Sequence, residues 1–195
     1  MVENILELRN VSVDVAGKRI LEDINLSIPK GEVHVLFGPN GSGKSSLLLA
    51  ILGYSSYKVV SGEIWFKGKE ITYLPVNERV ELGISVAFQN PPAIRGVKLG
   101  GIIRHFTPTK EKVIELVERV KFPDEFLKRD VNLGFSGGEV KKSEVLQIMA
   151  QDSDFMMLDE PDSGVDVENL QLIGKVIGDV LKERSALIIT HLGHI

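Results

Sequence analysis

The stretch VHVLFGPNGSGKSSLLLAIL at positions 33–52 constrains the fold of this chain more than any other segment. Val33, Val35, Leu36 and Phe37 form an apolar, partly β-branched run that is typical of a buried strand. The segment 46–52 continues as an apolar helix. Between them, Gly38–Ser45 matches the pattern G-x-x-x-x-G-K-[ST] at every fixed position. Because the pattern stands between a predicted strand and a predicted helix, we interpret it as a phosphate-binding loop.

The spacing of this loop suits a nucleoside triphosphate. Its glycines allow successive backbone N–H groups to point inward at phosphate oxygens, and the following helix adds the positive end of its dipole. We expect Lys44 to reach the β- and γ-phosphates and the hydroxyl of Ser45 to bind Mg²⁺. The residues expected to bind the nucleotide are Gly38, Pro39, Asn40, Gly41, Ser42, Gly43, Lys44, Ser45 and Ser46.

Composition excludes several other classes of protein. The net charge is −4, which argues against a general nucleic-acid binder. The absence of cysteine excludes disulfides and thiolate-bound metal or iron–sulfur clusters in this chain. No apolar run reaches the length of a membrane helix, and the first ten residues, MVENILELRN, do not resemble a signal peptide. We therefore expect a cytoplasmic protein.

The alternation of strand and helix patterns predicts an α/β fold with a mainly parallel core sheet. Residues 5–28 and 62–67 indicate an antiparallel β lobe, in which alternation places Trp65 on the apolar face, as a core residue. Residues 90–135 indicate a mostly helical insert. Further strands are expected at 84–88, 154–158 and 186–190, and helices at 77–82, 109–120, 137–151 and 167–180.

Polar residues follow three of the predicted strands. Asp159 and Glu160 close one strand, Gln89 follows a second and His191 a third. Because active groups gather at the carboxyl ends of parallel strands, we expect Asp159 to hold Mg²⁺ and Glu160 to activate the attacking water. Gln89 can contact Mg²⁺ or that water, and His191 can contact the γ-phosphate.

A second anion site is predicted where Ser136, Gly137 and Gly138 open a helix. One nucleotide site per chain leaves this turn unused, unless two copies pair head to tail and each offers the turn to the nucleotide of the other. One turn into the same helix, Lys141 is a candidate partner for Glu160 in the resting monomer; the alternative is a solvated lysine.

Taken in order, these segments resemble the full motif set of an ABC-type ATPase. FGPNGSGKS, Gln89, FSGGE, FMMLDEP, SGVD and TH are similar to its Walker A, Q-loop, signature, Walker B, D-loop and H-switch motifs. The resemblance implies a single ABC ATPase domain over 1–195, with 90–135 as its helical insert and a truncated C-terminus. It also implies hydrolysis of ATP with Mg²⁺ and an ATP-dependent homodimer. In that dimer Ser136, Gly137, Gly138 and Asp166 of one copy would contact the ATP of the other.

Finer details resemble the ATPase subunit of the Suf iron–sulfur cluster assembly system. They include AFQNPPAIRGV, Glu139 where transporters usually carry Gln, and Asp162 where they usually carry Thr. Only Val13 and Val15 are candidates for contact with adenine, which implies weak base stacking. The resemblance implies soluble iron–sulfur scaffold proteins as partners.

The alternative is the ATP-binding subunit of an ABC membrane transporter, which would pair with a membrane permease. An ATPase that handles nucleic acid would need heptad arms or a basic face, and we expect no nucleic-acid partner. A regulator without hydrolytic activity is disfavoured because Lys44, Asp159 and Glu160 are all present.

Overall fold

The computed structural model describes residues 3–107, 109–164, 167–182 and 184–190, which divide into two compact units. The described residues of unit 1 lie within Met1–Val86, Asp154–Asp159 and Glu183–His191. The described residues of unit 2 lie within Ala87–Ser153 and Glu160–Lys182. The expectation of one domain over 1–195 with an insert at 90–135 stays a prediction.

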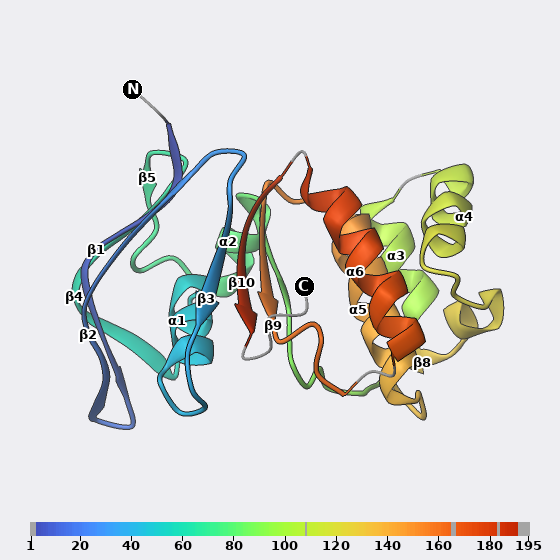
Figure 1. The fold of residues 1–195 in the computed structure, drawn as a ribbon, viewed down its shortest axis with the longest axis horizontal. Coiled ribbons are helices and arrows are strands. Elements are labelled where there is room, and N and C mark those ends of the chain that lie inside the picture. Colours follow the sequence, from blue (N-terminus) through green and yellow to red (C-terminus); the bar gives the residue numbers. More distant parts are fainter. Residues whose placement is uncertain (1–2, 108, 165–166, 183, 191–195) are drawn as a thin grey trace. The chain divides into compact units, whose positions relative to one another are not determined.

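Unit 1 contains the predicted antiparallel lobe as a sheet with the strand order β2-β1-β4-β5 (Figure 1). Its strands are β1 (Asn4–Val15), β2 (Lys18–Pro29), β4 (Tyr57–Phe66) and β5 (Lys69–Glu70). Leu6, Leu8 and Val13 of β1 and Ile64 and Phe66 of β4 are buried on one face of this sheet. Their alternation with polar residues explains why this lobe is readable from the sequence.

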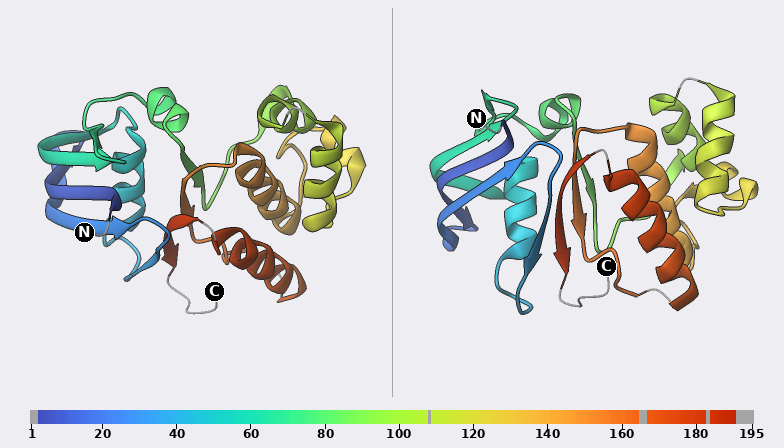
Figure 2. Two further views of the ribbon diagram at one scale, coloured as in Figure 1. Left: turned by 90° about the horizontal axis from the view of Figure 1, so that it is seen from above. Right: turned by 45° about the horizontal axis from the view of Figure 1, so that its top comes forward.

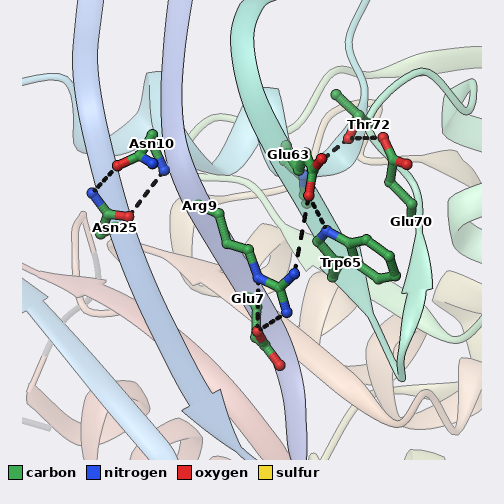
Figure 3. Close-up of polar contacts among 9 residues, drawn as sticks. Glu7, Arg9, Asn10, Asn25, Glu63, Trp65, Glu70 and Thr72 are labelled. Carbon is green, nitrogen blue, oxygen red and sulfur yellow. Dashed lines mark hydrogen bonds and ion pairs between the residues drawn. The ribbon is translucent and has the colours of Figure 1, made fainter.

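Trp65 does not belong to that core, and the sequence interpretation of this residue is wrong. Ile64 and Phe66 occupy the inward positions, so the period of two places Trp65 on the opposite face. There its indole N–H donates to Glu63, and the guanidinium of Arg9 lies 5.0 Å from the centre of its ring (Figure 3). Figure 3 shows Trp65 among polar side chains of neighbouring strands.

A second sheet of unit 1 has the order β3-β10-β9-β6, with β3, β10 and β9 parallel. Its strands are β3 (Val33–Phe37), β6 (Ile84–Ala87), β9 (Phe155–Asp159) and β10 (Ser185–Thr190). Helix α1 (Lys44–Leu52) lies between the two sheets, as the views of Figures 1 and 2 show. The short helix α2 (Val76–Glu81) follows β5. The α/β class with a parallel core sheet is confirmed.

Strand β3 lies at the edge of this sheet, and it is less buried than its apolar sequence predicts. Val33, Val35 and Phe37 are 39%, 44% and 59% exposed. They share one side of the strand, because side chains alternate along it. An edge position is decided by strand order, which the composition of a strand does not encode.

Unit 2 is mainly helical. Its helices are α3 (Leu99–Phe106), α4 (Lys110–Arg119), the 3₁₀ helix η1 (Asp124–Lys128), α5 (Gly137–Gln151) and α6 (Val167–Leu181). α5 packs against α3, α4 and α6. The short strands β7 (Ile94–Lys98) and β8 (Asp130–Val131) pair antiparallel; neither they nor α3 were expected. Among the residues described, no helix is both long and apolar enough to cross a membrane.

Candidate functional site

The phosphate loop predicted at Gly38–Ser45 joins β3 to α1 in unit 1. Gly41 and Gly43 have φ values of +81° and +93°, which residues with a Cβ rarely adopt. A Cβ on Gly43 would also lie 2.7 Å from Cδ2 of Leu21. The backbone angle therefore requires glycine before the lysine, and the absence of a Cβ lets the side chain of Leu21 in β2 pack against it.

Lys44 and Ser45 stand at the first turn of α1. The buried ammonium of Lys44 donates to the carbonyls of Gly38 (2.8 Å) and Pro39 (3.0 Å), so it lies within the curve of the loop. The hydroxyl of Ser45 donates to Asp159 Oδ1 at 3.2 Å. A hydroxyl and a carboxylate side by side are the oxygen ligands that suit Mg²⁺, and the cationic group in the loop suits phosphate. These residues of unit 1 fit the expected ligands.

Gln89 and Glu160, both in unit 2, contact each other through their side chains. The amide Nε2 of Gln89 donates to Oε2 of Glu160. Glu160 is buried and has a φ of +46°, an uncommon conformation for a residue other than glycine. Strain of this kind persists only where the surroundings hold it, which is typical of functional positions. Because of this contact, the two residues are candidates for orienting a water molecule together.

Lys141 reaches Glu160 through the backbone. Its ammonium lies near the carbonyl oxygens of Gln89 (3.0 Å), Glu160 (3.3 Å) and Phe88 (3.4 Å), and its side chain is buried. The alternative of a solvated lysine is therefore wrong. Lys141 joins the segment that starts at Phe88 to the residue that follows β9.

The signature turn forms the N-terminus of α5. Ser136 is its N-cap, and Ser136 and Glu139 form a capping box in which each side chain bonds the backbone N–H of the other. A Cβ on Gly137 would lie 2.8 Å from the carbonyl oxygen of Gly164, and one on Gly138 would lie 2.8 Å from Nδ2 of Asn169. Gly137 therefore leaves no room for a side chain against the backbone of Gly164, and Gly138 lets the side-chain amide of Asn169 lie against the first turn of α5.

Three other candidates remain outside this geometry. His191 and Asp166, the predicted switch and in-trans residues, lie outside the described residues. Val13 is fully buried in the antiparallel sheet, so its side chain is not available to adenine. Each of the other predicted residues belongs to one of the two units: the loop and Asp159 to unit 1, and Gln89, Glu160 and Ser136–Gly138 to unit 2.

Glu144 was missed by the sequence interpretation. It lies on α5 and is buried, and its carboxylate accepts a hydrogen bond from the backbone N–H of Phe88 at 3.4 Å. Burial raises the pKa of Glu144 above its usual value. One signal was available, because Glu144 stands three residues after Lys141 and such residues share a helix face.

Comparison with known proteins places most of these residues in one matched segment. The family model of ABC transporters matches residues 21–163, which include the phosphate loop, Gln89, the signature turn and the acidic pair. The chain is 40% identical over 203 residues to "Probable ATP-dependent transporter ycf16" of Trieres chinensis, with 96% of this chain and 81% of that protein covered.

Two further likenesses cover nearly the whole chain. "Vegetative protein 296" of Bacillus subtilis (strain 168) is 36% identical over 205 residues, which cover 98% of this chain and 78% of that protein. Among solved structures, the ADP conformation of MJ1267, an ATP-binding cassette of an ABC transporter, matches with a TM-score of 0.77 and 27% identity. That match covers 98% of this chain and 83% of that one.

Proposed function

Because this chain belongs to the ABC transporter family and is an ATPase that uses ATP and Mg²⁺, we propose that it drives conformational change in an iron–sulfur cluster assembly complex. The observation that carries the ATPase half of this proposal is the pairing of Gln89 with a buried Glu160 directly after β9. The partner half is supported by the details of sequence that resemble the Suf ATPase subunit.

Nucleotide binding is assigned to unit 1. The backbone N–H groups of the loop and the ammonium of Lys44 would bind the phosphates, and Ser45 and Asp159 would hold Mg²⁺. When bound, Mg²⁺ neutralises charge on the phosphate oxygens. The contacts of Lys44 with the loop carbonyls and of Ser45 with Asp159 support these roles.

Hydrolysis is assigned to Glu160 as the general base. Its carboxylate accepts a proton from the attacking water, and the amide of Gln89 orients that carboxylate. His191 contacts the γ-phosphate in this scheme. Support comes from the burial of Glu160 and its contact with Gln89, since a base fixed by a neighbour keeps its geometry for proton transfer.

Two copies act together in the proposal. Each offers Ser136, Gly137, Gly138 and Asp166 to the ATP bound by the other, so ATP closes the pair and hydrolysis reopens it. The capped N-terminus of α5, with two glycines that leave no side chain over the first turn, supports an anion contact there.

The partners are proposed to be soluble scaffold proteins that carry cysteine, since this chain has none of its own. Glu139 and Asp162, the two residues that differ from the usual transporter pattern, support a role in iron–sulfur cluster assembly. Glu139 forms the capping box with Ser136, and Asp162 is buried in the turn after β9.

A membrane transporter is the second candidate. It is favoured by the name of the relative from Trieres chinensis, a probable ATP-dependent transporter, and by the likeness to MJ1267, the ATP-binding cassette of an ABC transporter. In that case the same ATPase would drive a membrane permease.

The variant Glu160→Gln tests both the assignment of the general base and the proposed partners in one experiment. Without its base, we expect turnover to fall at least 100-fold while ATP binding is kept, because a general base contributes about 10²–10⁴-fold. ATP should then hold the closed pair together. Purification of this variant from its native cell with ATP and Mg²⁺, followed by mass spectrometry, identifies what binds.

We expect soluble scaffold proteins that contain cysteine to purify with the variant. An integral membrane permease would instead overturn the iron–sulfur proposal and support the membrane transporter. Turnover that survives in Glu160→Gln would overturn the assignment of the base. Wild-type protein purified with ADP is the control for binding that does not depend on the closed pair.

A further inference from the structure

Glu144 is a buried acid that the proposed reaction does not use. Its side chain lies on α5, where the residue is only 8% exposed. A carboxylate in such a position is unfavourable unless hydrogen bonds compensate for the loss of water. The hydrogen bonds of Glu144 therefore indicate which segment of the chain it stabilises.

Those contacts lead to the segment that carries Gln89. One carboxylate oxygen of Glu144 accepts from the backbone N–H of Phe88 (3.4 Å), and the other accepts from Nε2 of Gln147 (3.3 Å). The side chain of Asn132 also bonds to Glu144. Asn132 in turn donates to the carbonyl of Pro92 (3.3 Å), three residues beyond Gln89. Glu144 thus stands at the centre of a network that holds both ends of residues 88–92.

Lys141 completes this arrangement from the same helix. It donates to the carbonyls of Phe88 and Gln89, while Glu144 accepts from the N–H of Phe88. The donor and acceptor groups of this backbone are therefore held by opposite charges that stand three residues apart on one helix face. Because both side chains are buried, their positions are fixed. The backbone of Phe88 and Gln89, to which they bond, is therefore held in place as well.

We propose that Glu144 is a positioning residue that holds Gln89 in place to orient Glu160. The inference rests on the proposed function, in which Glu160 is the base and Gln89 its orienting partner. Glu144 acts through the backbone of Phe88 and does not touch the reacting atoms. Its loss therefore changes the rate of hydrolysis and leaves ATP affinity, which the proposal assigns to the loop of unit 1, nearly unchanged.

A double-mutant cycle between Glu144→Ala and Gln89→Ala measures this coupling. We expect Glu144→Ala to lower kcat at least tenfold in the wild-type background and less than twofold in the Gln89→Ala background. The Kd for ATP with Mg²⁺ of Glu144→Ala should stay within threefold of the wild-type value, and that of the double variant within threefold of the value for Gln89→Ala. Equal losses of kcat in the two backgrounds would overturn the proposal.

Two further variants separate positioning from general loosening of α5. Glu144→Gln keeps an oxygen that can accept from Phe88, so its kcat should stay within threefold of the wild-type value. Ile148→Ala removes a buried side chain from the same helix and should leave kcat per folded molecule within twofold. A loss in Ile148→Ala as large as that in Glu144→Ala would show that any damage to α5 suffices, and would overturn the specific role.

A readout that does not depend on turnover keeps this proposal separate from the assignment of the base. The side-chain amide resonance of Gln89, identified by its absence in Gln89→Ala, should shift in Glu144→Ala and stay near its wild-type position in Glu144→Gln. An unmoved resonance in Glu144→Ala overturns the positioning role. Turnover that survives in Glu160→Gln overturns the base and leaves the amide result readable.

Discussion

At the scale of single residues, Glu144 also makes stability depend on pH. Burial raises its pKa in the folded chain above the unfolded value of about 4.5, despite hydrogen bonds and Lys141 that lower it. The folded state therefore binds the proton more tightly than the unfolded state. The stability that this proton contributes is fully present below pH 4.5 and is lost as pH rises through the folded pKa.

We predict that Glu144→Gln gains stability relative to wild type as pH rises. Urea unfolding of both proteins at pH 4.5 and pH 8 gives the difference between their free energies of unfolding, which should favour the variant more at pH 8. The exposed Glu118→Gln is the matched control, and its difference should stay within about 0.5 kcal/mol at both pH values. A Glu144→Gln difference that is flat with pH contradicts the prediction.

At the scale of elements, Arg79 secures the end of α1 opposite to the phosphate loop. It is 2% exposed, and its guanidinium donates to four backbone carbonyls. Two belong to α1, Ala50 (3.0 Å) and Ile51 (2.7 Å), and two precede α2, Thr72 (2.9 Å) and Leu74 (2.8 Å). Burial lowers the pKa of Arg79 to about 10. The charge is tolerated because its donors reach carbonyls at the C-terminus of a helix, where the dipole favours a cation.

Arg79→Lys should destabilise the protein by about 3 kcal/mol, although the charge is kept. An ammonium cannot reach all of these carbonyls in the planar arrangement of a guanidinium, so buried acceptors lose their partners. Chemical denaturation at pH 7 measures the loss. Arg95→Lys on the exposed strand β7 is the control and should change stability by less than about 0.5 kcal/mol. An equal, small effect of the two substitutions would refute the role of Arg79.

The elements differ in how far the sequence predicts them. α5 and α6 were expected because apolar residues recur at helical spacing, and β9 and β10 because short apolar runs are bounded by turns. β7 and β8 were not expected, since every residue of β7 is exposed and β8 has only two residues. Short exposed strands form by pairing with each other and show no period of their own.

At the scale of the whole molecule, the residues proposed for one reaction come from two compact units. The chain passes from unit 1 to unit 2 after Val86 and again between the neighbours Asp159 and Glu160. Lys44, Ser45 and Asp159 thus belong to the unit assigned to ATP binding, and Gln89 and Glu160 to the unit assigned to hydrolysis.

ATP with Mg²⁺ should stabilise the chain through Lys44. A ligand at 100 times its Kd adds about 2.7 kcal/mol, which raises Tm by roughly 5–11 °C in a protein of this size. Differential scanning fluorimetry should show this rise in wild type and in the exposed control Lys69→Ala, and none in Lys44→Ala. A full rise in Lys44→Ala would exclude the loop as the main source of ATP binding.

The amino-acid sequence alone predicts the class of fold and the residues that we propose for the chemistry. The loop pattern, the acidic pair and the signature turn are local, since each depends on residues a few positions apart and on the strand or helix beside them. Which side chains are buried together depends instead on how the elements pack. Trp65 faces outward and β3 stands at an edge, and Glu144 lies under the backbone of Phe88. Such relations depend on strand order and on contacts between residues far apart in the chain, which no local pattern records.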